Sequence, residues 1–194
     1  MKSQLFTTTL RSIGLMTMLS LPAVAMAESA SSIDDAKRQR GEYLVSTSAC
    51  HDCHTPFTEA GEPDMSRKLS GHPQAMTVST PPKLEAPWLS AAAATNTAWF
   101  GPWGISFTAN LTPDLETGLG RWSEQDFIAT IRSGRHLGRG REILPPMPIP
   151  VYRNFTDADL AAIFSYLQSI PAVSNRVPDP LPPLEHALPT EALE

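Results

Sequence analysis

Cys50-His51-Asp52-Cys53-His54 is the stretch that decides how this chain folds. The spacing C-x-x-C-H is the attachment signature of haem c. Two thiols at this spacing form thioethers with the two vinyl groups of one porphyrin, and the histidine beside the second thiol supplies an imidazole to the iron. The motif therefore predicts one covalently bound haem c, held by Cys50, Cys53 and His54, with His54 as an iron ligand.

Two other interpretations of the cysteine pair exist. A C-x-x-C pair also occurs as the redox disulfide of thioredoxin-like proteins and as half of a zinc site. The first requires a βαβ pattern, and none is visible around the motif. The second requires further ligands, and the chain has no cysteine besides Cys50 and Cys53. Haem attachment is therefore favoured over both.

The second axial position of the iron is the next question. We favour Met147, because the prolines in 143–150 stiffen its loop and remove backbone donors. A lone methionine is more often a filler of the hydrophobic core, but the helix predicted after this loop would hold the sulfur in place. The candidates compared are Met65, Met76, Met147, His51, His72, His136 and His186. His54 and Met147 are thus the predicted metal ligands.

Closed ligation by His54 and Met147 leaves the iron no position for a substrate. It raises the reduction potential relative to bis-histidine ligation and is typical of an electron carrier. An open sixth position, with His136 or Arg139 over the iron, would instead indicate a peroxidase, or a ligand-binding or sensor protein. No catalytic residue is predicted under the favoured interpretation.

Residues 1–27 are predicted to be a signal peptide. Lys2 and Arg11 precede or flank an apolar stretch, which ends at the cleavage-like pattern Ala25-Met26-Ala27. The apolar stretch is shorter than the ~20 residues that a bilayer requires. We therefore expect export to the periplasm and no membrane span in the mature form.

The net charge excludes one class of partner. It is −5 for the whole chain and becomes −7 without residues 1–27, which contain two bases and no acid. An acidic protein is a poor ligand for nucleic acid, so we expect no nucleic-acid partner. The same charge favours a partner with a basic surface.

Helical periodicity predicts three main helices, over 32–49, 123–134 and 156–171, with Ser123 and Thr156 as N-caps. Gly41 inside the first is expected to permit the close approach of another helix. The 55–122 segment is proline-rich and is expected to be a loop-rich insertion, in which Ala91–Ala94 permits at most a short helix. The expected domain covers 28–174, and 175–194 is a proline-rich tail. Nothing in the pattern predicts a sheet.

These features together resemble the class I cytochrome c family with one haem. The resemblance is carried by Gly41-Glu42-Tyr43-Leu44, Cys50–His54, Pro146-Met147-Pro148 and Asp157–Pro171. It implies an all-α cytochrome c fold, with three main helices around one haem and the first and last helices crossing at Gly41 and an aromatic, Phe164 or Tyr166.

A second resemblance is to the haem domains of the cytochrome c subunits of membrane-bound alcohol and sugar dehydrogenases. It is carried by 106–114, 117–120, Trp122-Ser123 and Arg132-Ser133-Gly134. It implies a one-electron carrier between a dehydrogenase and a respiratory acceptor, itself not an enzyme and possible as a non-catalytic subunit of a dehydrogenase complex. The expected partners are a periplasmic dehydrogenase, an oxidase or another cytochrome.

Overall fold

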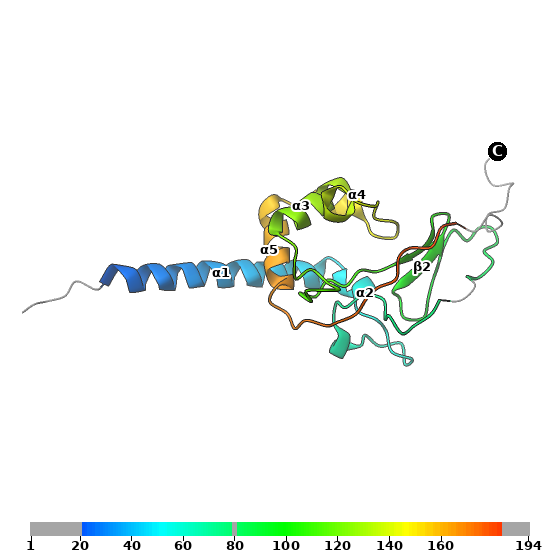
Figure 1. Ribbon diagram of the computed structural model, residues 1–194, viewed down its shortest axis with the longest axis horizontal. Coiled ribbons are helices and arrows are strands. Elements are labelled where there is room, and N and C mark those ends of the chain that lie inside the picture. The colour runs from blue at the N-terminus through cyan, green and yellow to red at the C-terminus, as the bar shows by residue number, and fades with distance from the viewer. Residues whose placement is uncertain (1–20, 79–80, 184–194) are drawn as a thin grey trace, which may run out of the picture. The chain divides into compact units, whose positions relative to one another are not determined.

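The computed structural model describes residues 21–78 and 81–183, which form helices and one small sheet (Figure 1). Two compact units divide the chain, residues 1–33 and 34–194. The predicted signal peptide lies largely outside the described residues. No helix within the described ranges has both the length and the apolar character needed to cross a bilayer.

The described helices are five α-helices and two short 3₁₀ helices. In chain order they are α1 (Leu21–Thr47), α2 (Cys50–His54), η1 (Met65–Arg67), α3 (Glu124–Ser133), η2 (His136–Gly138), α4 (Ile149–Tyr152) and α5 (Asp157–Leu167). The predicted start of the first helix at residue 32 is wrong, because α1 is already helical at Leu21. The last two residues of the proline-rich stretch 143–150 around Met147 already belong to α4, which begins at Ile149.

The all-α prediction is wrong, because the 55–122 segment contains a three-stranded antiparallel sheet. Its strands are β1 (Ala91–Ala92), β2 (Ala98–Gly101) and β3 (Gly104–Phe107), in the order β1-β2-β3. Strands of two and four residues are too short to show the alternating pattern from which a strand is predicted. Consecutive alanines at 91–94 favour helix by propensity, yet here pairing of Ala91 with Phe100 decides the conformation.

The other two predicted helices are confirmed with their N-caps, although α5 ends at Leu167, before the predicted end at residue 171. Ser123 caps α3 in a capping box with Asp126, and Gly134 ends that helix in a left-handed conformation. Thr156 caps α5 by accepting a hydrogen bond from the Asp159 amide. Local sequence was sufficient here because caps involve residues three positions apart.

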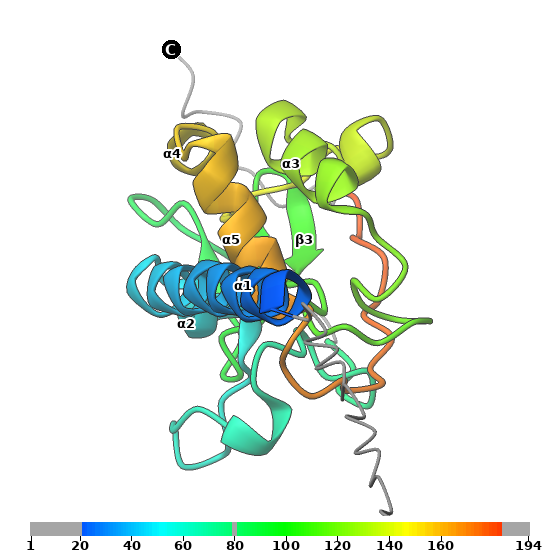
Figure 2. The same ribbon diagram turned by 90° about the vertical axis from the view of Figure 1, so that its left-hand side faces the viewer.

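Helices α1 and α5 cross (Figures 1 and 2), and Gly41 of α1 lies against Ala162 and Tyr166 of α5. A Cβ atom at this position would lie 1.9 Å from the carbonyl oxygen of Ala162 and 2.8 Å from Cβ of Tyr166. No side chain fits at such a distance, so the helix backbones come together only because residue 41 is glycine. The close approach predicted from the sequence is confirmed, with Tyr166 as the aromatic at the crossing.

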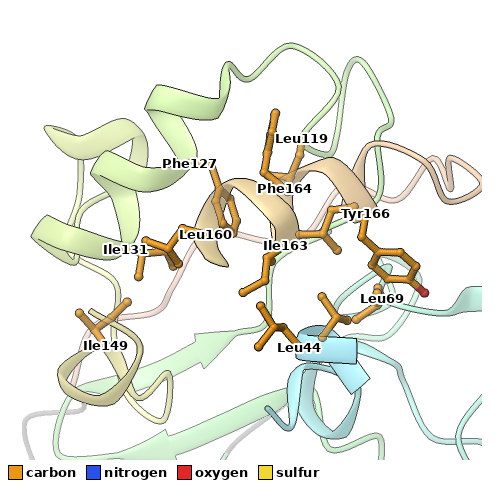
Figure 3. Packing of buried hydrophobic residues seen from close by; sticks show 12 residues of the cluster. Leu44, Leu69, Leu119, Phe127, Ile131, Ile149, Leu160, Ile163, Phe164 and Tyr166 are labelled. Carbon is orange, nitrogen blue, oxygen red and sulfur yellow. The ribbon is translucent and has the colours of Figure 1, made fainter. Parts of the chain in front are cut away.

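The hydrophobic core forms where α1, α3, α4 and α5 meet (Figure 3). Leu160 and Leu167 of α5 are each 1% exposed, and Val45 of α1 is fully buried. Burial of each side chain of this size stabilises the fold by about 1.5–3 kcal/mol. Phe127 and Phe164 pack with ring centroids 5.6 Å apart and join α3 to α5. The core therefore holds α5 between α1 and α3.

Substitution of Gly41 tests the helix crossing. In the Gly41→Ala variant the new methyl group meets the Ala162 carbonyl, and we expect the free energy of unfolding to fall by about 1–3 kcal/mol, as in other overpacked cores. This loss should occur although alanine is the better helix former by about 1 kcal/mol. Urea denaturation followed by circular dichroism measures it.

The matched control is Glu42→Ala, next to it on the exposed side of α1. Its free energy of unfolding should change by less than about 0.5 kcal/mol. A Gly41→Ala variant as stable as the wild type would contradict the close crossing.

Candidate functional site

A cavity of about 490 Å³ lies between α2, the loop after β3, α3, the loop of residues 143–148 and α5. We call residues 143–148 the Met147 loop. This volume is within the range of about 300–1,000 Å³ that is usual for ligand and cofactor pockets. Most of its wall is apolar. The lining residues that matter below are Cys50, Cys53, His54, Ala109, Asn110, Trp122, His136, Arg141, Met147, Tyr152, Arg176 and Asp179.

The C-x-x-C-H motif forms its own short helix, α2, on one side of this cavity. His54 is only 7% exposed, and its Nδ1 lies 2.8 Å from the backbone oxygen of Ala109. A carbonyl oxygen can only accept, so Nδ1 carries the proton and donates. Nε2 is then the unprotonated nitrogen, with its lone pair available to a metal. The hydrogen bond therefore fixes both the tautomer and the orientation of the ring.

Burial sets the protonation of the three motif side chains. It raises the pKa of the Cys50 thiol to about 11 and raises the pKa of Cys53. It also lowers the pKa of His54, which keeps the imidazole neutral. At neutral pH all three groups are therefore uncharged, as an apolar wall requires.

These shifts argue against the redox-disulfide alternative. Reactive C-x-x-C pairs have a cysteine whose pKa is lowered, because the thiolate is the attacking species. Here the nearby Asp52 raises the pKa of both thiols further. For the zinc alternative, residues 21–78 and 81–183 contain no cluster of three or more His, Cys, Asp or Glu side chains that would hold a metal ion.

Met147 lines the same cavity as the motif and packs partly buried against the hydrophobic core. Two hydrogen bonds hold its loop in place. The hydroxyl of Ser106 on β3 donates to the Pro145 carbonyl, and the hydroxyl of Tyr152 on α4 donates to the carbonyl of Ser48. The Met147 loop is thus tied both to the sheet and to the residues just before the motif.

The other candidates for the second axial position lie elsewhere, with one exception. Met65 is 62% exposed, and Met76 lines a separate groove beside the sheet. His72 does not line the cavity. It is buried, and its two ring nitrogens contact the Thr97 hydroxyl and the Met76 carbonyl oxygen. Of the candidates that the structure describes, Met147 and His136 line the cavity. His186 lies outside the described residues.

His136 is the weaker of the two cavity residues. It is exposed, and its ring meets the Trp122 ring edge-on with centroids 5.1 Å apart. Arg139, the other group required by an open-iron enzyme, does not line the cavity. Of the two candidates, Met147 is therefore the better placed in the cavity wall.

The 175–183 segment contributes to the site in a way that the sequence did not indicate. It returns along the sheet, where Leu181 and Ile105 exchange two backbone hydrogen bonds of 2.9 Å (Figure 1). Gly104 permits this approach, because its φ is +92° and a Cβ there would lie 2.1 Å from the Leu181 oxygen. Residues 176–179 then form part of the cavity wall. We call 175–181 the C-terminal strap.

Asn175 anchors the strap and is fully buried. Its amide nitrogen donates to the backbone oxygens of Ser70 and His72. Its side-chain oxygen accepts from Arg67 and from the Gln74 amide. All four hydrogen-bonding positions of the side chain are used. A buried, fully satisfied amide of this kind specifies one position for the strap.

No family model matches the chain. Among curated relatives, it is 27% identical over 156 residues to the cytochrome c subunit of the quinone alcohol dehydrogenase of Gluconobacter oxydans, which is 79% of this chain. It is 29% identical over 133 residues, 69% of the chain, to the gluconate 2-dehydrogenase cytochrome c subunit of Pantoea cypripedii. Over most of its length the chain is thus similar to cytochrome c subunits of alcohol, gluconate and fructose dehydrogenases. The resemblance drawn from the sequence motifs is confirmed.

These cytochrome relatives are much longer than the aligned part. The chain spans 26% and 23% of the length of the two subunits. It is also 41% identical over 78 residues to one of the subunits of the nicotinate dehydrogenase of Pseudomonas putida, which is 40% of the chain and 6% of that protein. The matches thus concern only a part of each of these longer proteins.

The residues of the cavity fit a haem c. Cys50, Cys53, His54 and Met147 all line one largely apolar space. Asn110 and Trp122 line the cavity, whereas Arg132 and Arg135 do not. Asn110 donates to the Val173 carbonyl instead. Arg141 and Arg176 are the cavity-lining arginines in the described part of the chain.

Removal of the Asn175 amide tests the strap. In the Asn175→Ala variant, four polar groups of residues 67–74 lose their partner; the buried Ser70 and His72 carbonyls each cost about 1–3 kcal/mol, and the partly buried Arg67 and Gln74 groups cost less. We expect the free energy of unfolding to fall by about 3 kcal/mol or more, measured by urea denaturation. The control Asn154→Ala removes an exposed amide that donates to two carbonyls, and it should cost less than about 1 kcal/mol. Equal losses in the two variants would contradict the anchoring role.

Proposed function

We propose that this chain is a c-type cytochrome that carries one electron at a time. Cys50 and Cys53 would bind a single haem c through thioethers, and His54 Nε2 and Met147 Sδ would be its axial ligands. The observation that carries the proposal is the meeting of these four side chains at one apolar cavity, with His54 oriented by Ala109. The cofactor supplies a reversible one-electron change at iron.

The protein residues have three tasks in this function. The Ala109 carbonyl accepts a hydrogen bond from Nδ1 of His54, which fixes the ring and leaves Nε2 available to the iron. The buried hydrophobic wall excludes water, which favours the neutral thioether ligand. Ser106 and Tyr152 anchor the Met147 loop, so that the sulfur does not swing away. Such rigidity keeps reorganisation small when the charge on the site changes.

We further propose that the chain works as a non-catalytic partner of a dehydrogenase and passes electrons to a respiratory acceptor. The support is that relatives over 69–79% of the chain are named as cytochrome c subunits of dehydrogenases. Residues 28–174 would be the cytochrome domain, together with the strap that the structure adds to its wall. Export to the periplasm rests on the pattern that ends at Ala25-Met26-Ala27.

The Met147→Ala variant tests the sixth ligand. With Met147 bound, the reduced holoprotein should not bind carbon monoxide, and the oxidised form should show the weak charge-transfer band of methionine ligation at the red end of the spectrum. The variant should lose this band and bind carbon monoxide stoichiometrically. Its reduction potential should fall, because the thioether stabilises ferrous iron. Optical titration and spectroelectrochemistry measure these changes.

Met65→Ala is the matched control, since Met65 is 62% exposed and does not line the cavity. Its spectra and potential should equal those of the wild type. If the wild type itself binds carbon monoxide, the iron is open. The peroxidase or sensor alternative, with His136 in the cavity, would then replace the carrier.

A further inference from the structure

The positive charges of this acidic chain are unevenly distributed. The 132–153 segment contains five arginines against one glutamate, a formal charge of +4 in a chain of net charge −5. This segment includes the end of α3, η2, the Met147 loop and α4. A local positive region therefore surrounds the residue that we propose as the second iron ligand.

Most of these arginines are not neutralised by ion pairs. Ion pairs in the described structure use the basic groups of Lys37, Arg38, Arg40, Lys83, Arg121 and Arg132. Arg135, Arg139, Arg141 and Arg153 are exposed and pair with no carboxylate among the described residues. We call these four residues the arginine patch.

Backbone contacts place three members of the patch on one tight loop at the cavity. Residues 135 and 142 form a β-bridge, and the His136 amide donates to the Arg141 oxygen. Arg141 itself lines the cavity. Arg153 ends α4 and is joined to α3 through its carbonyl, which accepts from Arg132. The patch therefore reaches the cavity through Arg141, and it flanks the Met147 loop because Arg141 and Arg153 lie just before and just after that loop in the chain.

Three carboxylates lie close to the patch and do not cancel its positive charge. Glu142 follows Arg141 in the loop. Asp126 lies near Arg139. The pKa of Asp126 is lowered mainly by hydrogen bonds from Ser123 and, to a smaller extent, by the positive charge of Arg139. Asp157 is already paired with Arg132. The surface that remains is positive.

An exposed apolar surface adjoins the arginines. Val151 of α4 is 64% exposed, and the prolines at 145, 146, 148 and 150 are exposed as well. Apolar area with a charged rim is the usual composition of a protein docking site. The stiff proline loop would lose little conformational entropy when a partner covers it.

We propose that the arginine patch and the Met147 loop form the docking surface for a redox partner with a carboxylate-rich surface beside its own redox centre. This inference rests on the proposed electron-transfer function and deepens it. The acidic partner proposed here is the opposite of the basic partner expected from the net charge of the whole sequence. At physiological ionic strength the Debye length is about 8 Å. A partner that approaches the Met147 loop therefore responds to the nearby arginines more than to acids on the far side.

The sign of the salt dependence tests the proposal. Reduced holoprotein is oxidised in stopped-flow experiments by ferricyanide, an anion, and by tris(phenanthroline)cobalt(III), a cation. If the arginine patch controls approach, the ferricyanide rate should fall about tenfold as salt rises from low to high ionic strength, and the cobalt rate should rise. A ferricyanide rate that rises with salt would follow the net charge of −5 and overturn the proposal.

The charge variants locate the effect. In Arg135→Gln/Arg139→Gln/Arg153→Gln the ferricyanide salt dependence should shrink to about twofold or less, since the charges that attract the anion are gone. The control, Arg38→Gln/Lys83→Gln/Arg121→Gln, removes the same charge from exposed local ion pairs and should behave as the wild type. Arg141 is left in place because it lines the cavity.

Binding of a macromolecular polyanion completes the test. Poly-L-glutamate should bind the wild type and the control variant in low salt, and it should bind the patch variant at least about tenfold more weakly. Patch-dependent co-sedimentation with phosphatidylglycerol vesicles, without poly-L-glutamate binding, would assign the patch to lipid and overturn the protein partner. Failure of the reduced protein to react with either oxidant would instead contradict the electron-transfer function itself.

Discussion

The contact between Gly41 and the Ala162 carbonyl is the constraint on which the rest of the domain depends. It brings α1 and α5 together at backbone distance, so that Leu44 and Val45 pack on the buried face of α5. The C-x-x-C-H helix follows α1 after two residues. The crossing therefore fixes the position of the motif relative to α5, whose Leu160, Ile163 and Leu167 form part of the cavity wall.

A cavity of about 490 Å³ occupies space that side chains of the hydrophobic core would otherwise fill. The wall around it must therefore be held rigid by other contacts. This chain does so with irregular backbone held by specific polar contacts. Ala109 fixes His54, Ser106 fixes the Met147 loop, and Asn175 fixes the strap. Each contact joins segments more than thirty residues apart. In the holoprotein the covalent cofactor would add two further links to this network.

Charge in this protein acts locally. The total is negative, yet the loop that contains Met147 lies among arginines without carboxylate partners in the described structure. Screening makes the nearest charges dominant for a partner that approaches within a Debye length. Local surroundings also explain the neutral interior, where burial keeps the Cys50 and Cys53 thiols protonated and His54 uncharged.

By itself the sequence determined the features that depend on neighbours in the chain. These are the C-x-x-C-H motif, the caps Ser123 and Thr156, the apolar face of α5 and the role of glycine at 41. Tertiary structure alone decided the sheet at 91–107, since strands of two to four residues exist only through pairing, in part with Leu181. It also decided that the C-terminal strap forms part of the cavity wall and that Arg141 lines the same cavity as Met147. Such contacts join distant residues, and short-range patterns contain no information about them.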